Sequence, residues 1–168
     1  MAKAPETKYR IGEFVIYRES GIYRITDIRA MRFHSDKESL YYALESLNDP
    51  KTSVFVPVKT DPVRPTLRRL AQNAQVRDLI KRKKALTIDW IEDTRERAAS
   101  YGEAVKSSDL ETIYRIYRAL SAYKKRVEAE NKKFYASDEK VLDTARRLVA
   151  EEIAFVLEIE KNEALKLL

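Results

Sequence analysis

Two prolines, Pro62 and Pro65, separate two parts of the sequence that have different hydrophobic periods. Within residues 9–58, short runs rich in β-branched and aromatic residues alternate with turn-forming residues, which is typical of antiparallel strands. Beyond the prolines, apolar residues recur at the spacing of amphipathic helices. Proline lacks a backbone N–H and fixes φ, so the pair excludes regular structure between the two parts. The sequence therefore predicts an α+β protein with domains at residues 1–65 and 66–168. A boundary just after Leu70 is the alternative.

The first domain is predicted to consist of short strands. Strand-like runs occupy residues 14–17, 22–32, 40–47 and 53–58, and residues 66–70 are a candidate for a last strand. Gly21 lies in the turn after the first run, where it can adopt a positive φ. So many strands within about 60 residues favour a small, strongly bent antiparallel β-barrel of the Tudor/SH3-like kind over an open sheet. Tyr41 and Tyr42 point to opposite faces of their strand, so at most one lies in the core.

The second domain is predicted to be an all-α helical bundle. Helices are expected from Asn73 to about Lys83, from Thr87 or Asp89 to Tyr101, from the capping box Ser108–Glu111 onward, and from Ser137 or Asp138 onward. Gly102 is expected to end the second helix, because glycine is favoured just past a helix C-terminus. Three tyrosines at helical spacing are expected to be core or half-buried: Tyr114, Tyr117 and Tyr123.

Positive charge is concentrated in residues 64–84. This stretch has eight Lys and Arg residues against one acid, Asp78, and so carries +7, while the whole chain carries +6. The only tryptophan, Trp90, follows six residues after Lys84, and Arg95 and Arg97 come next. Local positive charge beside one large flat side chain is typical of a nucleic-acid-binding surface. The alternative is a solvated basic helix face with Trp90 in the core.

The composition argues against several classes of function. The chain has no cysteine, which rules out disulfides and thiolate metal sites, and its single histidine, His34, cannot build a metal site alone. No phosphate-binding glycine loop or serine nucleophile motif occurs, so neither an enzyme, a cofactor nor a small-molecule substrate is expected. Without an apolar leader or a membrane-spanning run, we expect a cytoplasmic protein with no membrane partner.

These segments, in this order, resemble the CarD family of bacterial transcription regulators from about residue 9 to 157. In the first domain the resemblance rests on Arg10–Tyr17, on Gly21 at the family's distance from Gly12, on Tyr41–Leu44 and on Val56–Pro57. In the second domain it rests on Trp90 at the position of the family's tryptophan, on Arg95 one turn on, and on matches within residues 139–154.

The resemblance implies a mechanism. The first domain would be the polymerase-interacting domain shared with transcription-repair coupling factor, and it would dock on the β subunit of RNA polymerase. The helical domain would contact promoter DNA near the upstream edge of the melted region, with Trp90 as an exposed minor-groove wedge that stabilises the open complex. Such a protein would be nucleoid-associated. The residues expected to contact DNA are Trp90, Arg95, Arg97, Lys81, Arg82, Lys83, Lys84, Lys140 and Arg146, and those expected to contact polymerase are Arg29, Met31, Arg32 and Phe55.

Two departures from the family pattern leave a second function open. Trp90 is followed by Ile91-Glu92-Asp93, where the family usually has basic residues. Met31 and Phe55 stand where the family has polymerase-facing arginines; Arg29 or Arg32 can replace the first, but nothing replaces the second, so a more apolar contact is expected. The alternative is a protein–protein adaptor on RNA polymerase that does not bind DNA.

Overall fold

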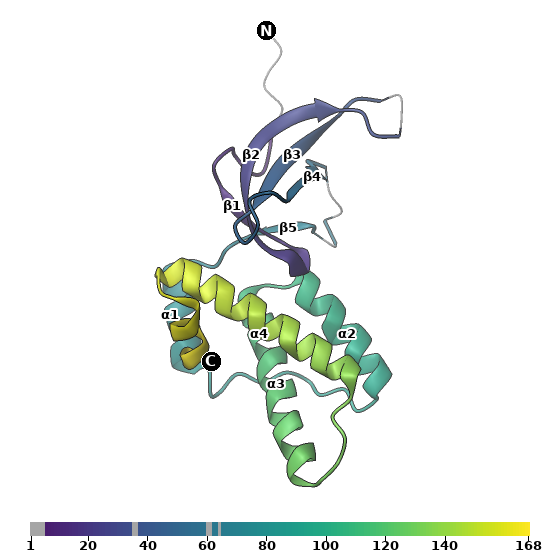
Figure 1. Ribbon diagram of the computed structural model, residues 1–168, viewed down its shortest axis with the longest axis vertical. Coiled ribbons are helices and arrows are strands. Elements are labelled where there is room, and N and C mark those ends of the chain that lie inside the picture. The colour runs from purple at the N-terminus through teal and green to yellow at the C-terminus, as the bar shows by residue number, and fades with distance from the viewer. Residues whose placement is uncertain (1–5, 35–36, 60–61, 64) are drawn as a thin grey trace. The chain divides into compact units, whose positions relative to one another are not determined.

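A computed structural model describes residues 6–34, 37–59, 62–63 and 65–168. Within these ranges the chain forms five β-strands followed by five α-helices, which is an α+β arrangement (Figure 1). It divides into two compact units, Met1–Arg69 and Leu70–Leu168. The division lies after the last strand, one residue before the alternative boundary just after Leu70.

All strands of the first unit belong to one antiparallel sheet. They are β1 (Phe14–Tyr17), β2 (Gly21–Met31), β3 (Ser39–Ser46), β4 (Ser53–Pro57) and β5 (Leu67–Arg69), in the order β4-β3-β2-β1-β5. A short 3-10 turn at Arg18–Ser20 joins β1 to β2, and Gly21 has the positive φ of 99° that the turn requires. The predicted strands are confirmed, and the candidate at residues 66–70 is β5.

The predicted barrel is not closed. Among the residues that the structure describes, no ladder joins β4 to β5, so the sheet has two edges. A bulge between Ile25 and Asp27 interrupts the register of β2 with β3, and β2 is visibly curved (Figure 1). The structure therefore supports a bent, open five-stranded sheet, and the Tudor/SH3-like detail is not confirmed.

One face of this sheet forms the core of the first unit. Its fully buried side chains come from four strands and include Val15, Ile25, Leu44 and Val56. Tyr42 is 1% exposed and belongs to this core, whereas Tyr41 is only half-buried. Because neighbouring strand residues project to opposite faces, one tyrosine of the pair lies in the core, as predicted.

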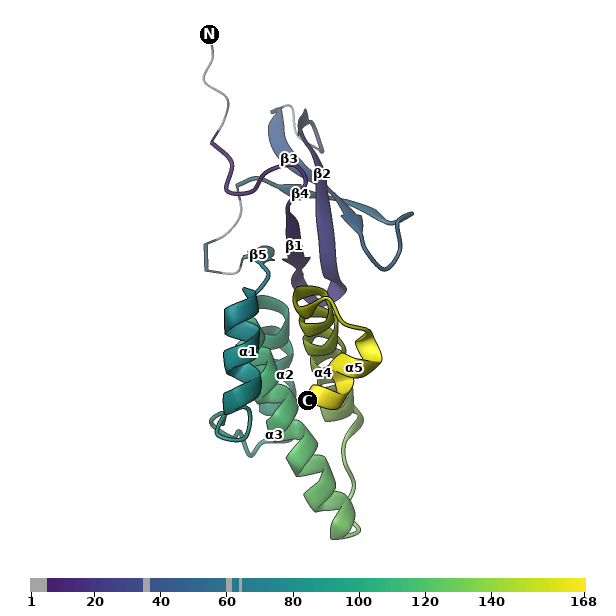
Figure 2. The same ribbon diagram turned by 90° about the vertical axis from the view of Figure 1, so that its left-hand side faces the viewer.

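The second unit is a bundle of five helices among the described residues. They are α1 (Asn73–Arg82), α2 (Thr94–Ser107), α3 (Leu110–Ala129), α4 (Ala136–Leu157) and α5 (Lys161–Leu167). Helix α4 packs against each of the other four, and Figures 1 and 2 show it running through the bundle. The centre of its apolar stripe, including Ala145, Val149 and Ile153, is fully buried. The predicted tyrosines are buried or half-buried as expected.

Helix α2 begins later than predicted. Asp93, rather than Thr87 or Asp89, is its N-cap and accepts a hydrogen bond from the backbone N of Glu96 at 2.8 Å. As a result, residues 86–93 connect α1 to α2 without helical structure. We call residues 86–93 the Trp90 segment.

Helix α2 also continues past Gly102, which does not end it. A glycine inside a helix costs about 1 kcal/mol relative to alanine, so it weakens a helix without forbidding it. A Cβ at this position would lie 3.7 Å from Cγ2 of Val141, an ordinary packing distance. The close approach of α4 shows that packing between helices outweighs the local preference of this residue.

Candidate functional site

Trp90 is half-buried, a position between the exposed wedge and the core residue that the sequence left open. Its ring centroid lies 4.8 Å from that of Tyr123 on α3 and 6.2 Å from that of Tyr101 on α2. Both contacts are tilted or edge-on, which is a favourable arrangement for aromatic rings. The indole therefore packs on one side of the helical unit and keeps part of its surface exposed.

Arg97, predicted to contact DNA, is 1% exposed, so the structure places its side chain in the interior of the helical unit. Its Nη2 donates to Oδ2 of Asp138 at 2.5 Å, and its Nε donates to Oδ1 of the same carboxylate at 3.1 Å. Burial lowers the pKa of Arg97, but the hydrogen bonds and charge of Asp138 outweigh this effect and leave the pKa raised. The guanidinium is thus charged, paired within the protein and shielded from solvent.

Arg97 holds the Trp90 segment in place. Its Nη1 donates to the carbonyl oxygens of Ile91 and Glu92, at 2.9 and 3.0 Å. Its Cζ lies 4.6 Å from the centroid of the Trp90 ring, within range of a cation–π contact. On the other side of the tryptophan, the Tyr101 hydroxyl donates to the carbonyl oxygen of Asp89 at 2.7 Å. Arg97 is therefore a positioning residue for the indole.

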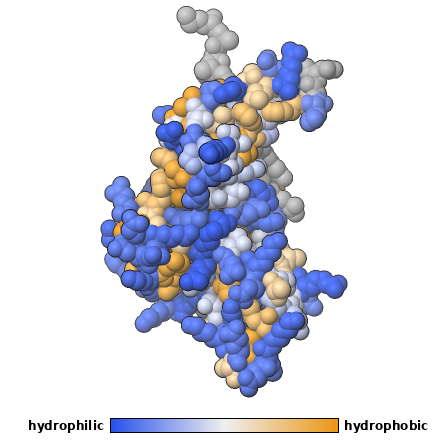
Figure 3. Space-filling view, viewed as in Figure 1, coloured by the Kyte–Doolittle hydropathy of each residue, from blue (hydrophilic) through white to orange (hydrophobic). Residues whose placement is uncertain are grey.

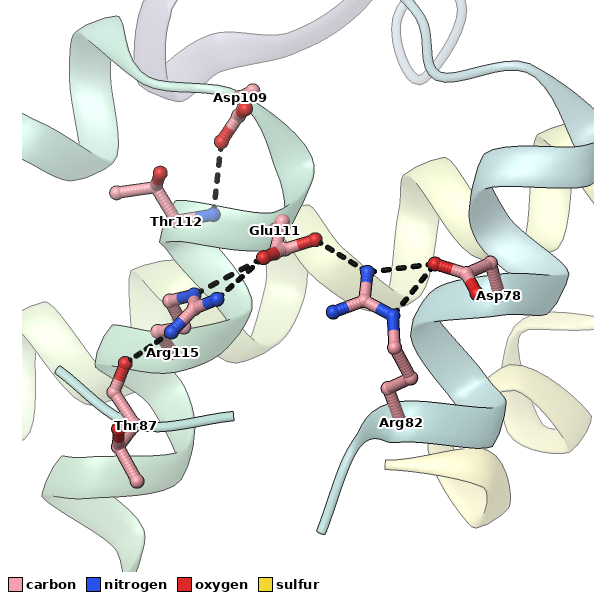
Figure 4. A network of polar contacts seen from close by, with 7 residues as sticks. All are labelled: Asp78, Arg82, Thr87, Asp109, Glu111, Thr112 and Arg115. Carbon is pink, nitrogen blue, oxygen red and sulfur yellow. Dashed lines mark hydrogen bonds and ion pairs between the residues drawn. The ribbon is translucent and has the colours of Figure 1, made fainter. Parts of the chain in front are cut away.

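The basic stretch is only partly available to a ligand, because some of its residues join helices. Arg82 donates to Asp78 at 2.7 Å and to Glu111 at 2.8 Å (Figure 4). Glu111 also accepts from Arg115, whose Nη1 donates to the carbonyl oxygen of Thr87 at 2.5 Å. These contacts join α1 to α3 and α3 to the Trp90 segment (Figure 4).

The same contacts shift the ionisation of their members. Hydrogen bonds from Arg115 and then Arg82 hold the pKa of Glu111 below its usual value. Hydrogen bonds to Asp78 and Glu111 raise the pKa of Arg82. The charge of Arg82 is therefore partly balanced by two carboxylates.

The remaining cations of the predicted DNA-contacting set lie at the surface, apart from Lys83. The Lys83 ammonium donates to the carbonyl oxygen of Leu167 and is half-buried. The exposed members are Lys81, Lys84, Arg95, Lys140 and Arg146. On the face drawn in Figure 3, hydrophilic side chains cover most of the helical unit, with smaller hydrophobic areas between them. Within the predicted set, Arg97 contacts Trp90.

A cavity beside Trp90 was not predicted from the sequence. It has a volume of about 370 Å³ and lies between the Trp90 segment and one face of α3. From α3 it is lined by Arg115, Arg118, Ala119, Ala122, Tyr123 and Arg126, and from the segment by Leu86, Thr87, Ile88 and Trp90. The α3 residues recur at three- and four-residue spacing, so they share one helix face. The spacing alone indicates that these residues share a helix face. Only the fold shows that this face lies opposite the Trp90 segment.

The first unit carries a partly exposed aromatic patch, which we define as Phe33, Tyr41 and Phe55. The Phe33 ring centroid lies 5.0 Å from that of Tyr41 and 6.2 Å from that of Phe55. Phe33 is 42% exposed and Phe55 38% exposed. Arg29 pairs opposite Tyr41 in the ladder, and its Cζ lies 5.7 Å from the Phe55 centroid.

The structure brings together part of the predicted polymerase-contacting set. Arg29 and Phe55 are in contact, and Met31 lies two residues beyond Arg29 on β2, which places it on the same face of the sheet. Arg32 follows the end of β2 and is exposed. The sequence reasoning missed Phe33 and Tyr41, whose aromatic character close to Arg29 was the available signal.

In the part of the chain that the structure describes, no group of three or more His, Asp or Glu side chains is arranged to hold a metal ion.

No helix among the described residues combines the length and apolarity needed to cross a bilayer.

Each unit corresponds to a known domain family. A family model described as "CarD-like/TRCF RID domain" matches residues 9–70, and one described as "CarD, C-terminal domain" matches residues 75–168. No curated protein matches the chain. Both are families of interaction domains rather than of catalytic ones. The chain therefore belongs to the CarD family and carries the N-terminal RNA-polymerase-interacting domain that gives this family its link to transcription regulation.

Proposed function

We propose that this protein docks on the β subunit of RNA polymerase through its sheet unit and stabilises the open promoter complex through its helical unit. Family membership supports regulation of transcription through polymerase. The β subunit as the docking site, DNA contact near the upstream edge of the melted region, a Tudor-like docking domain and association with the nucleoid are parts of this proposal.

The aromatic patch supports the docking step. Aromatic and arginine side chains carry most of the binding energy in many protein interfaces. Here Phe33 and Phe55 are exposed beside Arg29. The Arg29 side chain is itself about half exposed, and its guanidinium is paired with Asp27 at 2.9 Å. Phe55 lies on β4, an edge strand of the sheet, where a partner can approach. We propose that this patch is the polymerase-docking surface.

The way in which Trp90 is held carries the proposal for DNA contact. Unstacking a base step costs a few kcal/mol. In the open complex polymerase has already separated the strands, so the tryptophan does not have to supply this free energy. A side chain fixed beforehand loses little conformational entropy on insertion. Arg97 and Tyr101 fix the backbone on both sides of Trp90, while part of the indole stays exposed. Preference for the open state by about 1.4 kcal/mol shifts the equilibrium tenfold.

Surface cations supply the rest of the DNA contact in this proposal. Lys81 is exposed on α1, Lys84 just after it, and Arg95 on α2. Lys140 and Arg146 are exposed on α4. Such residues attract phosphates without reading sequence, and the attraction weakens with salt. Tethering to polymerase raises the local concentration to roughly millimolar, so weak intrinsic affinity is sufficient.

The test is the lifetime of open promoter complexes with Trp90→Ala. We expect the full-length variant to bind polymerase normally but to shorten the lifetime about tenfold relative to the unchanged protein. Tyr135→Ala is the matched control, because Tyr135 is an exposed aromatic residue of the same unit that lies outside the Trp90 segment. A folded, polymerase-bound Trp90→Ala protein with an unchanged lifetime contradicts the proposal.

The second candidate is an adaptor on polymerase that leaves DNA alone. Two observations favour it. Glu92 and Asp93 are exposed beside Trp90, and both repel phosphates. In addition, Arg97 and Arg82 are already paired with carboxylates of the chain. The two candidates differ in whether charge reversal at the surface lysines changes the open-complex lifetime.

A further inference from the structure

The cavity beside Trp90 is open to solvent and partly apolar. Its volume is about 370 Å³, and its lining includes Thr87 from the Trp90 segment and Ala122 from α3, both of which are exposed. Ile88, Trp90 and Ala119 are half-buried in the same lining and provide apolar surface. An open cavity with apolar walls can bury side chains of another molecule.

The charged side chains of this lining are all arginines. Arg115 is balanced by Glu111 at 2.6 Å and donates to the carbonyl oxygen of Thr87. Arg118 is half-buried and Arg126 is exposed, and neither forms an ion pair with a residue that the structure describes. Two guanidinium groups at the cavity therefore remain to attract an acidic ligand.

The spacing of these two arginines defines the shape of a complementary ligand. Eight positions of α3 separate Arg118 from Arg126, which corresponds to about 12 Å along the helix axis. Ala119 and Ala122 lie between them in the lining, and their short side chains leave room for another chain. The complementary ligand therefore has two negative groups about this far apart and apolar surface between them.

An acidic protein helix fits this pattern better than a strand of nucleic acid does. A helix can carry two carboxylates seven residues apart on one face, which is about 10.5 Å along its axis, with aliphatic side chains between them. A nucleic-acid strand carries a charge at every nucleotide and has little aliphatic surface. Carboxylates also form paired hydrogen bonds with guanidinium groups.

We propose that the cavity beside Trp90 docks an acidic amphipathic helix of a partner protein. One carboxylate lies at Arg118 and one at Arg126, and the aliphatic side chains between them pack against the two alanines of α3. This contact goes beyond the proposed function, because neither the sheet unit nor promoter DNA takes part in it. Because Trp90 lines the cavity, docking changes the surroundings of the indole.

Emission of the full-length protein reports docking, because Trp90 is the only tryptophan. The probe is a helical peptide without aromatic residues that has two glutamates seven positions apart and leucines at the third and fourth positions after the first glutamate. One control peptide has lysines in place of the glutamates, and the other has the same composition with the leucines on the opposite face. We expect a saturable change in emission with the probe and binding about tenfold weaker, or weaker still, with both controls.

Variants connect the signal to the cavity. Arg126→Gln removes one exposed charge and should weaken binding of the acidic peptide about tenfold. Lys125→Gln is the matched control, since it removes one charge from the neighbouring exposed position, outside the cavity lining. Ala122→Leu takes up space in the cavity without changing charge and should abolish binding, so the test does not depend on Arg126 alone.

The proposal is overturned if the acidic peptide does not saturate the signal, if the peptide with displaced leucines binds equally well, or if both cavity variants bind like Lys125→Gln. A short oligo(dT) is titrated in parallel at the same ionic strength. Saturation by oligo(dT) alone identifies nucleic acid as the occupant. A change in emission with protein concentration alone identifies a second copy of the chain, and either result contradicts the proposal.

Discussion

Arg97 and Asp138 form an ion pair that is 1% exposed on both sides and joins α2 to α4 across 41 positions of sequence. The same guanidinium lies against Trp90 and donates to two carbonyls of the Trp90 segment. The packing of α2 against α4 and the position of Trp90, the proposed DNA-contacting residue, therefore depend on one side chain.

Removing the carboxylate of this pair should destabilise the protein strongly. Asp138→Asn leaves the buried guanidinium without its counter-charge, and breaking a buried pair from one side costs about 3–5 kcal/mol. The measurement is the free energy of unfolding in urea. Glu139→Gln is the control, because the neighbouring Glu139 pairs with Lys124 near the surface and should matter much less. Equal losses in the two variants would contradict a special role for the buried pair.

Replacing Arg97 with lysine should loosen Trp90. A lysine keeps the charge but lacks the planar group that contacts the indole, Asp138 and two carbonyls at once. We expect acrylamide to quench Trp90 fluorescence more strongly in Arg97→Lys and the open-complex lifetime to fall with it. Arg95→Lys, an exposed change on the same helix, should leave quenching unchanged. If Arg97→Lys quenches like the unchanged protein, Arg97 does not position the indole.

Glu111 should make stability depend on pH. Its folded-state pKa lies below the usual value of 4.5, because Arg115 and Arg82 donate hydrogen bonds to the carboxylate. Its contribution is therefore complete above pH 4.5 and is lost as the pH falls through the folded-state pKa. Glu111→Gln should lose less than about 1 kcal/mol at neutral pH, since water screens a partly exposed group.

The sign of the pH effect provides the check. The difference in unfolding free energy between the unchanged protein and Glu111→Gln should shrink as the pH is lowered below 4.5. If this difference in unfolding free energy grows as the pH falls, the Glu111 carboxylate does not have the lowered folded-state pKa.

Truncating Phe55 should weaken polymerase capture more than it weakens the fold. Phe55→Ala removes the ring that contacts Arg29 and Phe33, and a residue that is 38% exposed contributes modestly to stability. Capture of polymerase by the immobilised full-length protein measures the effect, and we expect a loss of about tenfold for a central interface aromatic. Leu47→Ala, at an exposed apolar residue just after β3, should capture polymerase normally.

Reversing charge at Lys81 and Lys84 separates the two candidate functions. Both side chains are exposed, and neither makes an ion pair within the described part of the chain. If the helical unit contacts DNA, the double change to glutamate shortens open-complex lifetime and reduces its salt dependence, with polymerase binding intact. An unchanged lifetime supports the adaptor.

Local chemistry explains which elements could be predicted. β-branched and aromatic runs identified β1 to β4, and the three- and four-residue period identified α1, α3 and α4. The start of α2 was misplaced, because Thr87, Asp89 and Asp93 are all capable N-caps and only packing selects among them. The barrel was an inference from strand number, but closure depends on edge pairing that strand content does not specify.

The sequence by itself determined the family, the two-part organisation and the elements whose hydrophobic period is regular, because each of these depends on residues close together in the chain. Only the tertiary structure decided that Arg97 is buried, that Arg82 joins helices and that an arginine-lined cavity lies beside Trp90. The physical reason is distance along the chain: Asp138 lies 41 positions from Arg97 and Glu111 lies 29 from Arg82, so no local pattern reveals which cations already have partners.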